Sequence, residues 1–258
     1  MAINKGEIDE LKAKLSLIYW RDNKLHNIEK VGFYNLKTMD YIEYPSHNYS
    51  LLDICNMGIT ELQKNCSLLK IDKAPSIIKA DVSINNINVS LKSKRGALPA
   101  LINHTNRIGI KKVFDRIKLD IEPLDNAIDD YWNKRLNKII QEDIKMSHDT
   151  SPFKSIKNIT MVPLLAYFLF KGTGSSDSKI QADSLWEFDN PTDFATWKNL
   201  LPNEVAESII DKTVVSIRSK KGMPKNYNDN PTTEEDKSIK KWTRFIDGHY
   251  RGALHIRG

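Results

Sequence analysis

Asp81 and Lys92 stand on either side of a turn sequence. An aspartate can bind a divalent metal, and a lysine beside it can bind a phosphate group. Polar and apolar residues alternate over 77–84 and again over 87–94, which predicts two β-strands. The Asn85-Asn86 pair between them tolerates the positive φ of a tight turn. The sequence therefore predicts a β-hairpin over residues 77–94.

The length of this turn does not change which side chains share a face. A two-residue turn places Asp81 opposite Ser90 and diagonal to Lys92, and a four-residue turn places it opposite Lys92. In both registers the three side chains lie on one face, with neighbouring β-carbons about 5–8 Å apart. An acid opposite a lysine is also an ordinary cross-strand pair on a solvated face, and this interpretation stands beside the catalytic one.

The composition is typical of a soluble globular protein. The chain has 258 residues, of which 40% are hydrophobic and 28% charged, so it can bury a full core. The longest apolar run, 159–170, is too short to span a bilayer and contains Pro163. Cys55 and Cys66 lack metal-ligand spacing and fit a reducing compartment. We therefore expect a cytoplasmic protein that does not bind a membrane.

Positive charge is concentrated in two parts of the chain. The formal net charge is +6. Residues 92–118 contain eight Lys or Arg and one acid, and residues 211–258 contain eleven Lys or Arg and six acids. Between them, residues 119–150 contain eight acids and four Lys or Arg. This uneven distribution favours a surface that binds a polyanion.

The order of expected elements indicates a mixed α/β (α+β) protein with a central mixed β-sheet flanked by helices. The chain contains no GxGxxG, GxxxxGK[ST], GxSxG or HExxH motif, which argues against dinucleotide, P-loop, serine hydrolase and zincin sites. We expect a single domain over residues 1–258. Hydrophobic periodicity and turn residues predict helices over 7–20, 51–56 (capped by Ser50), 59–69, 100–117 (interrupted at Gly109), 124–146, 159–170 and 202–210, and strands within 25–46 and over 185–188, 213–219 and 240–256.

The combination of Asp81, a turn and Ser90-Leu91-Lys92 resembles the catalytic hairpin of the PD-(D/E)xK nuclease superfamily, in particular type II restriction endonucleases. In that family an aspartate on one strand is followed by an acid, any residue and a lysine on the next. The resemblance implies a restriction-endonuclease-like core with the catalytic hairpin within residues 1–150. It also implies DNA-recognition elements and the remaining sheet within residues 151–258.

The chain departs from this pattern at two positions. Ala80 stands where the family has proline, and Ser90 stands where it has the second metal-binding acid. With Ser90 there, the resemblance implies that a metal is held by Asp81, the Leu91 carbonyl, oxygens of the scissile phosphate and an acid from the helix before the hairpin. Glu61 is the candidate for that acid, and an exposed glutamate paired with a nearby lysine is its alternative interpretation.

The function implied by the resemblance is a Mg²⁺-dependent, sequence-specific endonuclease of double-stranded DNA, with Asp81, Ser90 and Lys92 as its catalytic residues. Lys92 would stabilise negative charge in the transition state and orient or deprotonate the attacking water. A non-catalytic nucleic-acid-binding protein and a structure-specific repair or junction nuclease are the alternatives. The resemblance also suggests a homodimer and a cognate DNA methyltransferase as partners. The candidate DNA-binding residues are Lys94, Arg95, Asn103, His104, Arg107, Arg218, Lys220, Lys221 and Arg251.

Overall fold

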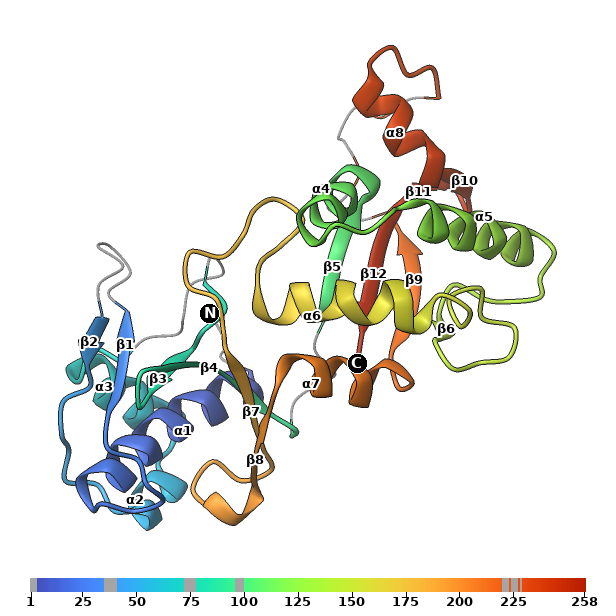
Figure 1. Cartoon of the computed structure of the whole chain (residues 1–258). Coiled ribbons are helices and arrows are strands. Elements are labelled where there is room, and N and C mark those ends of the chain that lie inside the picture. The colour runs from blue at the N-terminus through green and yellow to red at the C-terminus, as the bar shows by residue number, and fades with distance from the viewer. Residues whose placement is uncertain are drawn as a thin grey trace. The chain divides into compact units, whose positions relative to one another are not determined.

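The chain folds into two compact units, each built from two separate segments. The computed structural model describes residues 4–34, 41–71, 78–95, 100–219, 223, 227 and 229–258. Unit 1 consists of Met1–Ala97 and Ser178–Pro202, and unit 2 of Leu98–Asp177 and Asn203–Gly258. The predicted mixed α/β class is confirmed, with the strands of the described residues arranged in three sheets (Figure 1).

Unit 1 contains a six-stranded sheet in the order β2-β1-β3-β4-β7-β8. Strands β4 and β7 are parallel, and the other neighbours are antiparallel. The parallel pair joins the two segments of the unit. The strands are β1 (Val31–Tyr34), β2 (Tyr41–Glu43), β3 (Val82–Ile84), β4 (Ile87–Ser93), β7 (Ser184–Phe188) and β8 (Trp197–Leu200); a short 3₁₀ turn, η2 (Phe194–Thr196), precedes β8.

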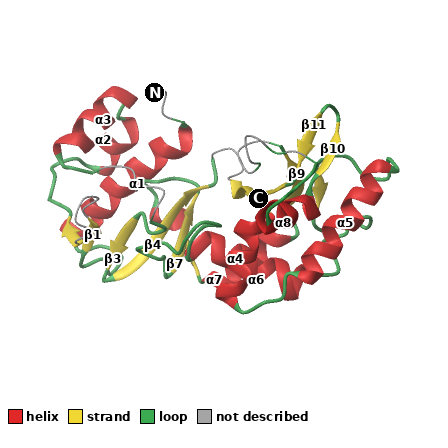
Figure 2. Ribbon diagram, turned by 90° about the horizontal axis from the view of Figure 1, so that it is seen from above, coloured by secondary structure: helices red, strands yellow, loops and turns green. Residues whose placement is uncertain are grey.

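Three helices cover one face of this sheet: α1 (Lys5–Asp22), α2 (Leu51–Asn56) and α3 (Ile59–Leu68) (Figure 2). The predicted cap is present, because the Ser50 side chain accepts a hydrogen bond from the amide of Asp53. Helix α1 lies at the centre of the unit and is buried on most of its sides. Its apolar side chains form one core with those of α2, α3, β3, β4 and β7.

Unit 2 contains an antiparallel four-stranded sheet in the order β5-β12-β9-β6 and a separate two-stranded sheet, β10-β11. Its strands are β5 (Ala100–Asn106), β6 (Ile144–Lys145), β9 (Val214–Arg218), β10 (Arg244–Ile246), β11 (His249–Arg251) and β12 (Ala253–Arg257). Its helices are α4 (Arg107–Ile117), α5 (Glu122–Leu136), α6 (Val162–Phe170), α7 (Pro202–Ile210) and α8 (Glu234–Trp242), with one π-helical turn, η1 (Lys157–Met161), before α6.

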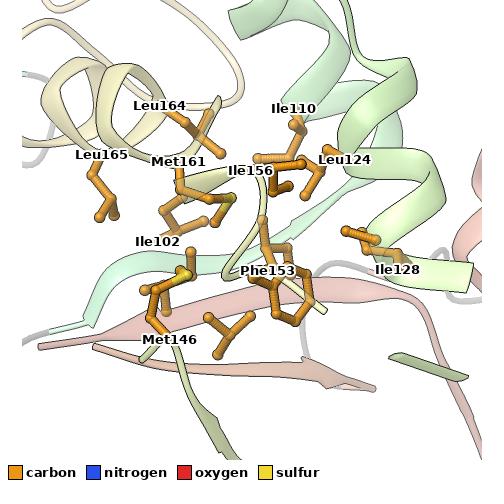
Figure 3. Close-up of a cluster of buried hydrophobic side chains, with 14 of the residues drawn as sticks. Ile102, Ile110, Leu124, Ile128, Met146, Phe153, Ile156, Met161, Leu164 and Leu165 are labelled. Atoms are coloured by element: carbon orange, nitrogen blue, oxygen red, sulfur yellow. The ribbon is translucent and has the colours of Figure 1, made fainter. Parts of the chain in front are cut away.

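Helices α4 and α6 pack against one face of the four-stranded sheet, and α8 packs against α4 and α5. Figure 3 shows this apolar layer, to which Ile102 of β5, Ile110 of α4, Leu124 of α5 and Leu164 of α6 all contribute. Val215, Ile217, Leu254 and Ile256 contribute to the same core from β9 and β12. Because side chains alternate along a strand, the residues between them face away from the helices.

The helix predicted over 100–117 is wrong in its first half, where the chain forms β5. The Asn106 side chain accepts a hydrogen bond from the amide of Gly109, so a helix begins at Arg107. Gly109 therefore lies in the first turn of α4 and does not interrupt it.

Two further boundaries differ from those expected. Helix α5 ends at Leu136, ten residues before its predicted end, and Lys138 then adopts a left-handed φ of 58° that cannot continue a helix. Residues 240–242, predicted as strand, belong to α8. This helix is capped by Thr233, has acids in its first turn and lysines in its last, and so its charges suit the helix dipole. Among the described residues, no helix combines the length and apolar character needed to cross a membrane.

Candidate active site

The predicted hairpin is present as β3 and β4, with Val82 paired to Val89 and Ile84 to Ile87. The turn is the two-residue one: Asn85 and Asn86 have φ of 50° and 68°. The first strand is shorter than predicted. It begins at Val82, residues 78–81 approach it without strand structure, and Ile77 lies outside the described residues.

Asp81 sits where β3 begins and is fixed by groups of β4. Its amide donates to the Val89 carbonyl at 2.8 Å. One carboxylate oxygen, Oδ2, accepts hydrogen bonds from the Ser90 hydroxyl at 3.1 Å and from the Leu91 amide at 2.7 Å. The expected proximity of Asp81 and Ser90 is therefore realised. In this arrangement Ser90 acts as a hydrogen-bond donor that orients the aspartate.

The Leu91 carbonyl points toward the same edge of β4 as Asp81. Within a strand, the N–H and C=O of one residue point to the same side. Because the Leu91 amide donates to Asp81, its carbonyl also faces the edge that β3 leaves uncovered beyond Val82. A main-chain oxygen therefore faces the same strand edge as the Asp81 carboxylate. Lys92 follows on the same face of β4 as Ser90 and is exposed.

A second carboxylate comes from α1 and was missed in the sequence. Burial and, to a smaller extent, the charge of Asp81 raise the pKa of Glu10, while Lys14 and Lys92 act in the opposite direction. Glu61, the acid expected from the helix before the hairpin, is exposed in the first turn of α3. The sequence feature that could identify Glu10 is the distribution of apolar residues in α1. Its apolar residues do not keep to one stripe, so the helix is buried on most of its sides and the polar residues on those sides need buried partners.

Lys14, one turn after Glu10, is that partner. Its ammonium nitrogen lies 2.9 Å from Glu10 Oε1, and its side chain is 1% exposed. Burial opposes the charge, but Tyr44, Glu10 and Asp81 outweigh burial and raise the pKa of Lys14. The ammonium is therefore retained as a cation inside the unit, beside two carboxylates.

A third lysine, Lys79, approaches from the segment before β3. Its amide donates to the Ile180 carbonyl at 2.9 Å, and its neighbours Ile78 and Ala80 pack with Ile180. Burial and the nearby charge of Lys92 lower the pKa of Lys79 to about 8, while Asp81 acts against them. We refer to Glu10, Lys14, Lys79, Asp81 and Lys92 as the carboxylate–lysine cluster.

The oxygen donors of this cluster fit Mg²⁺. Mg²⁺ in enzymes is commonly bound by one or two carboxylates and substrate phosphates, and it keeps several waters. Asp81, Glu10 and the Leu91 carbonyl are hard oxygen donors of that kind. No group of three or more His, Cys, Asp or Glu side chains that could hold a metal occurs in the described part of the chain. A metal here would therefore depend on the substrate's own oxygens.

The predicted DNA-binding residues near the hairpin are engaged in ion pairs. Lys94 lies 3.2 Å from Glu187 and 3.6 Å from Asp189. Arg95 donates to both oxygens of Asp9, a buried carboxylate of α1 that also accepts from Ser93. These contacts tie the end of β4 to α1 and β7.

The remaining predicted residues lie in unit 2. Arg107 is buried and donates to both oxygens of Asp125 and to Ser238, so its guanidinium is committed to the interior. Asn103 and His104 occupy β5, Arg218 ends β9 and Arg251 ends β11. Lys220 and Lys221 lie outside the described residues.

Comparison of the chain with protein-family models, with curated proteins and with solved structures finds no match. The chemistry of the site therefore rests on its own residues.

Proposed function

We propose that this protein is a Mg²⁺-dependent endonuclease that hydrolyses phosphodiester bonds of double-stranded DNA, with a restriction-endonuclease-like site in unit 1. The observation that carries the proposal is the fixed carboxylate of Asp81. It is oriented by Ser90 and Leu91 at an open strand edge, with Glu10 and lysines around it. Acidic oxygens hold a cation, and ammonium groups attract and stabilise a phosphate.

The arrangement of elements supports the same proposal. A hairpin with an aspartate at the start of its first strand and a lysine on its second is followed by a strand, β7, parallel to the second. Helix α1 packs behind these strands and supplies Glu10. Glu10 takes the role that the family pattern gives to the acid at the position of Ser90.

Each residue has a distinct task in the proposed reaction. When bound, Mg²⁺ lowers the pKa of a bound water and neutralises charge on the phosphate. Asp81, Glu10 and the Leu91 carbonyl supply its protein ligands. Lys92 binds a non-bridging phosphate oxygen and stabilises the negative charge that develops there. Ser90 keeps the Asp81 carboxylate in one orientation through its hydroxyl hydrogen bond.

The finer parts of the proposal concern substrate choice and biological setting. We propose a type II enzyme that cuts at a short recognition sequence, works in the cytoplasm, and is accompanied by a methyltransferase that protects the same sequence. A palindromic sequence would be cut by a homodimer, because the symmetry of the protein then matches that of the site.

Digestion of phage DNA tests the proposal. The purified chain is incubated with DNA and Mg²⁺, and in parallel with Ca²⁺ or EDTA. Discrete bands with Mg²⁺ alone are expected, and Asp81→Asn or Lys92→Ala should abolish them while leaving DNA binding in Ca²⁺ unchanged. Cleavage that survives both substitutions would overturn the assignment of the site.

The same experiment separates the alternatives. A non-catalytic DNA-binding protein is favoured by Ser90 in place of an acid and by the Lys14–Glu10 ion pair, which occupies one of the two carboxylates. It would retard DNA without cutting it under any metal. A structure-specific nuclease would cut branched or nicked substrates and leave linear phage DNA intact.

A further inference from the structure

A group of arginines lies on the face of the unit 2 sheet that is turned away from its helices. Ile256 and Leu254 of β12 belong to the core, so His255 and Arg257 face the other way. Val215 and Ile217 of β9 are core residues as well, and Arg218 accordingly lies on the same outer face as His255.

Arg218 and Arg257, and also Arg251 at the end of β11, are each paired with an acid from the segment before β6. Arg218 Nη2 lies 2.9 Å and Arg257 Nη2 2.5 Å from the two oxygens of Asp143. Arg251 Nη1 lies 2.7 Å from Glu142 Oε1, and Arg218 Nε lies 3.7 Å from the same oxygen. We refer to Arg218, Arg251 and Arg257 with Glu142 and Asp143 as the arginine array. Arg251 also lies 3.8 Å from Asp247, and Glu142 lies 4.0 Å from Arg135. Asp143 and Arg257 are 38% and 39% exposed.

Two buried nitrogen atoms of this region point to a ligand. His255 Nδ1 and Arg251 Nε make no hydrogen bond among the described residues, and His255 is 8% exposed. A buried polar group without a partner is costly, and it is commonly explained by a ligand or function. Arg251 is itself a member of the arginine array, and His255 lies on β12, the strand that carries Arg257.

The backbone beside His255 is strained. His104 has a φ of 45°, at a point where the register between β5 and β12 shifts and β5 contains an extra residue. Its ring stacks on that of His255 with centroids 4.5 Å apart. Bulges of this kind redirect a side chain and are frequent beside functional sites. Here the bulge brings a second imidazole to the edge of the array.

The charges around His255 favour an anion over a metal cation. Burial, His104, Arg218 and Arg257 together lower the pKa of His255 to about 4, and Asp143 only partly offsets them. Arg218 and Arg257, which oppose a proton on His255, repel a metal ion there as well. Phosphate oxygens suit this environment, because a guanidinium presents paired N–H donors to them.

We propose that the arginine array and His255 bind backbone phosphates of DNA, and that Glu142 and Asp143 occupy the arginines as phosphate mimics until DNA displaces them. The proposal rests on the proposed function, since DNA is taken as the polyanion. Solvent-accessible ion pairs are weak and can be exchanged readily for contacts to a polyanion, whose binding releases counterions. Glu142 and Asp143 therefore lower the affinity of the free protein for DNA.

The test measures binding of a fluorescent DNA duplex by the full chain in EDTA, at several salt concentrations. Asp143→Asn should tighten binding about fivefold beyond its control. Arg257→Gln should weaken binding about tenfold and reduce the salt slope by about one. The control is Asp129→Asn, which removes the same charge from an exposed pair of unit 2, Arg244–Asp129 at 3.0 Å.

The possible outcomes are distinct. Equal affinities for Asp143→Asn and Asp129→Asn, together with an unchanged salt slope in Arg257→Gln, would overturn the inference while leaving the nuclease proposal intact. No binding by the unmodified chain in EDTA or in Ca²⁺, together with no cleavage in Mg²⁺, would instead overturn the proposed function. As a check that does not depend on activity, the ¹⁵N resonances of the His255 ring should shift when DNA is added to the full chain.

Discussion

The two units combine cations and acids in opposite ways. In unit 1 the carboxylate–lysine cluster is partly or fully buried apart from Lys92, and burial is the largest cause of the altered pKa of both Glu10 and Lys79. In unit 2 the arginine array is partly exposed and consists of guanidiniums, which stay charged at all relevant pH values. Lysine and glutamate respond to their surroundings by changing protonation, which suits chemistry. Arginine keeps its charge and donor geometry, which suits binding.

The two groups also differ in how the backbone takes part in them. The unit 1 cluster gathers at a strand edge left open because β3 starts at Val82, so main-chain groups such as those of Leu91 take part in it. The unit 2 array includes Arg218 and Arg257 from two strands that are paired with each other, so side chains alone reach outward there. A reaction centre needs groups converging on one point, whereas a nucleic-acid surface needs charges spread along it.

The largest effect is expected for Glu10→Gln, which removes the second acid of unit 1. The rate of Mg²⁺-dependent cleavage should fall by about 10³-fold, because a neutral amide replaces a charged oxygen ligand. Plasmid nicking and linearisation at saturating protein measure it. Glu61→Gln is the matched control and should leave the rate unchanged, since Glu61 is exposed on α3. The opposite result would restore Glu61 as the metal-binding acid.

Arg107→Gln and Arg257→Gln compare how much a buried and an exposed arginine of unit 2 contribute to the free energy of unfolding. Arg107→Gln leaves Asp125 inside the unit without its bidentate partner, which costs about 3–5 kcal/mol of unfolding free energy. Arg257→Gln, on an exposed pair, should cost less than about 1 kcal/mol. Denaturation by urea followed by tryptophan fluorescence compares the two variants. Similar losses for both would show that the array is also a structural element.

Lys79→Met tests whether burial disfavours the charge of this lysine. Below pH 8 the folded chain carries the buried ammonium, so the variant should melt about 2–4 °C higher. Between pH 8 and about 10.5 the folded side chain loses its proton while the unfolded one keeps it, so wild-type stability rises with pH. The advantage of the variant should therefore vanish across that window. A pH-independent difference in melting temperature would contradict this account.

Ser90→Ala should have the smallest effect. It removes one of two donors to Asp81 and leaves the Leu91 amide in place, so cleavage should slow about tenfold without loss of Mg²⁺ dependence. Single-turnover cleavage rates at several Mg²⁺ concentrations measure it. A complete loss of cleavage would indicate that Ser90 contacts the substrate directly.

The features that could be predicted from the sequence depend on local rules. Alternation on both sides of Asn85-Asn86 determined the hairpin and the proximity of Asp81 and Ser90, and Ser50 identified its helix start. Glu10 could not be found in this way, because it reaches Asp81 from a helix more than seventy residues earlier. The strand at 100–106 was mistaken for helix because its apolar residues fit both periods, and only the Asn106 cap marks the boundary.

The interruption of unit 1 by residues 98–177 has a consequence for the order in which the chain is made. By Arg95 a growing chain contains Glu10, Lys14, Asp81 and Lys92, but β4 still lacks its parallel neighbour β7, which begins only at Ser184. Pairing of distant parallel strands is slow, so the first segment of unit 1 keeps an unpaired strand edge while the inserted segment is synthesised. The nascent protein thus possesses its candidate reactive groups about ninety residues before it possesses the strand that completes the sheet around them.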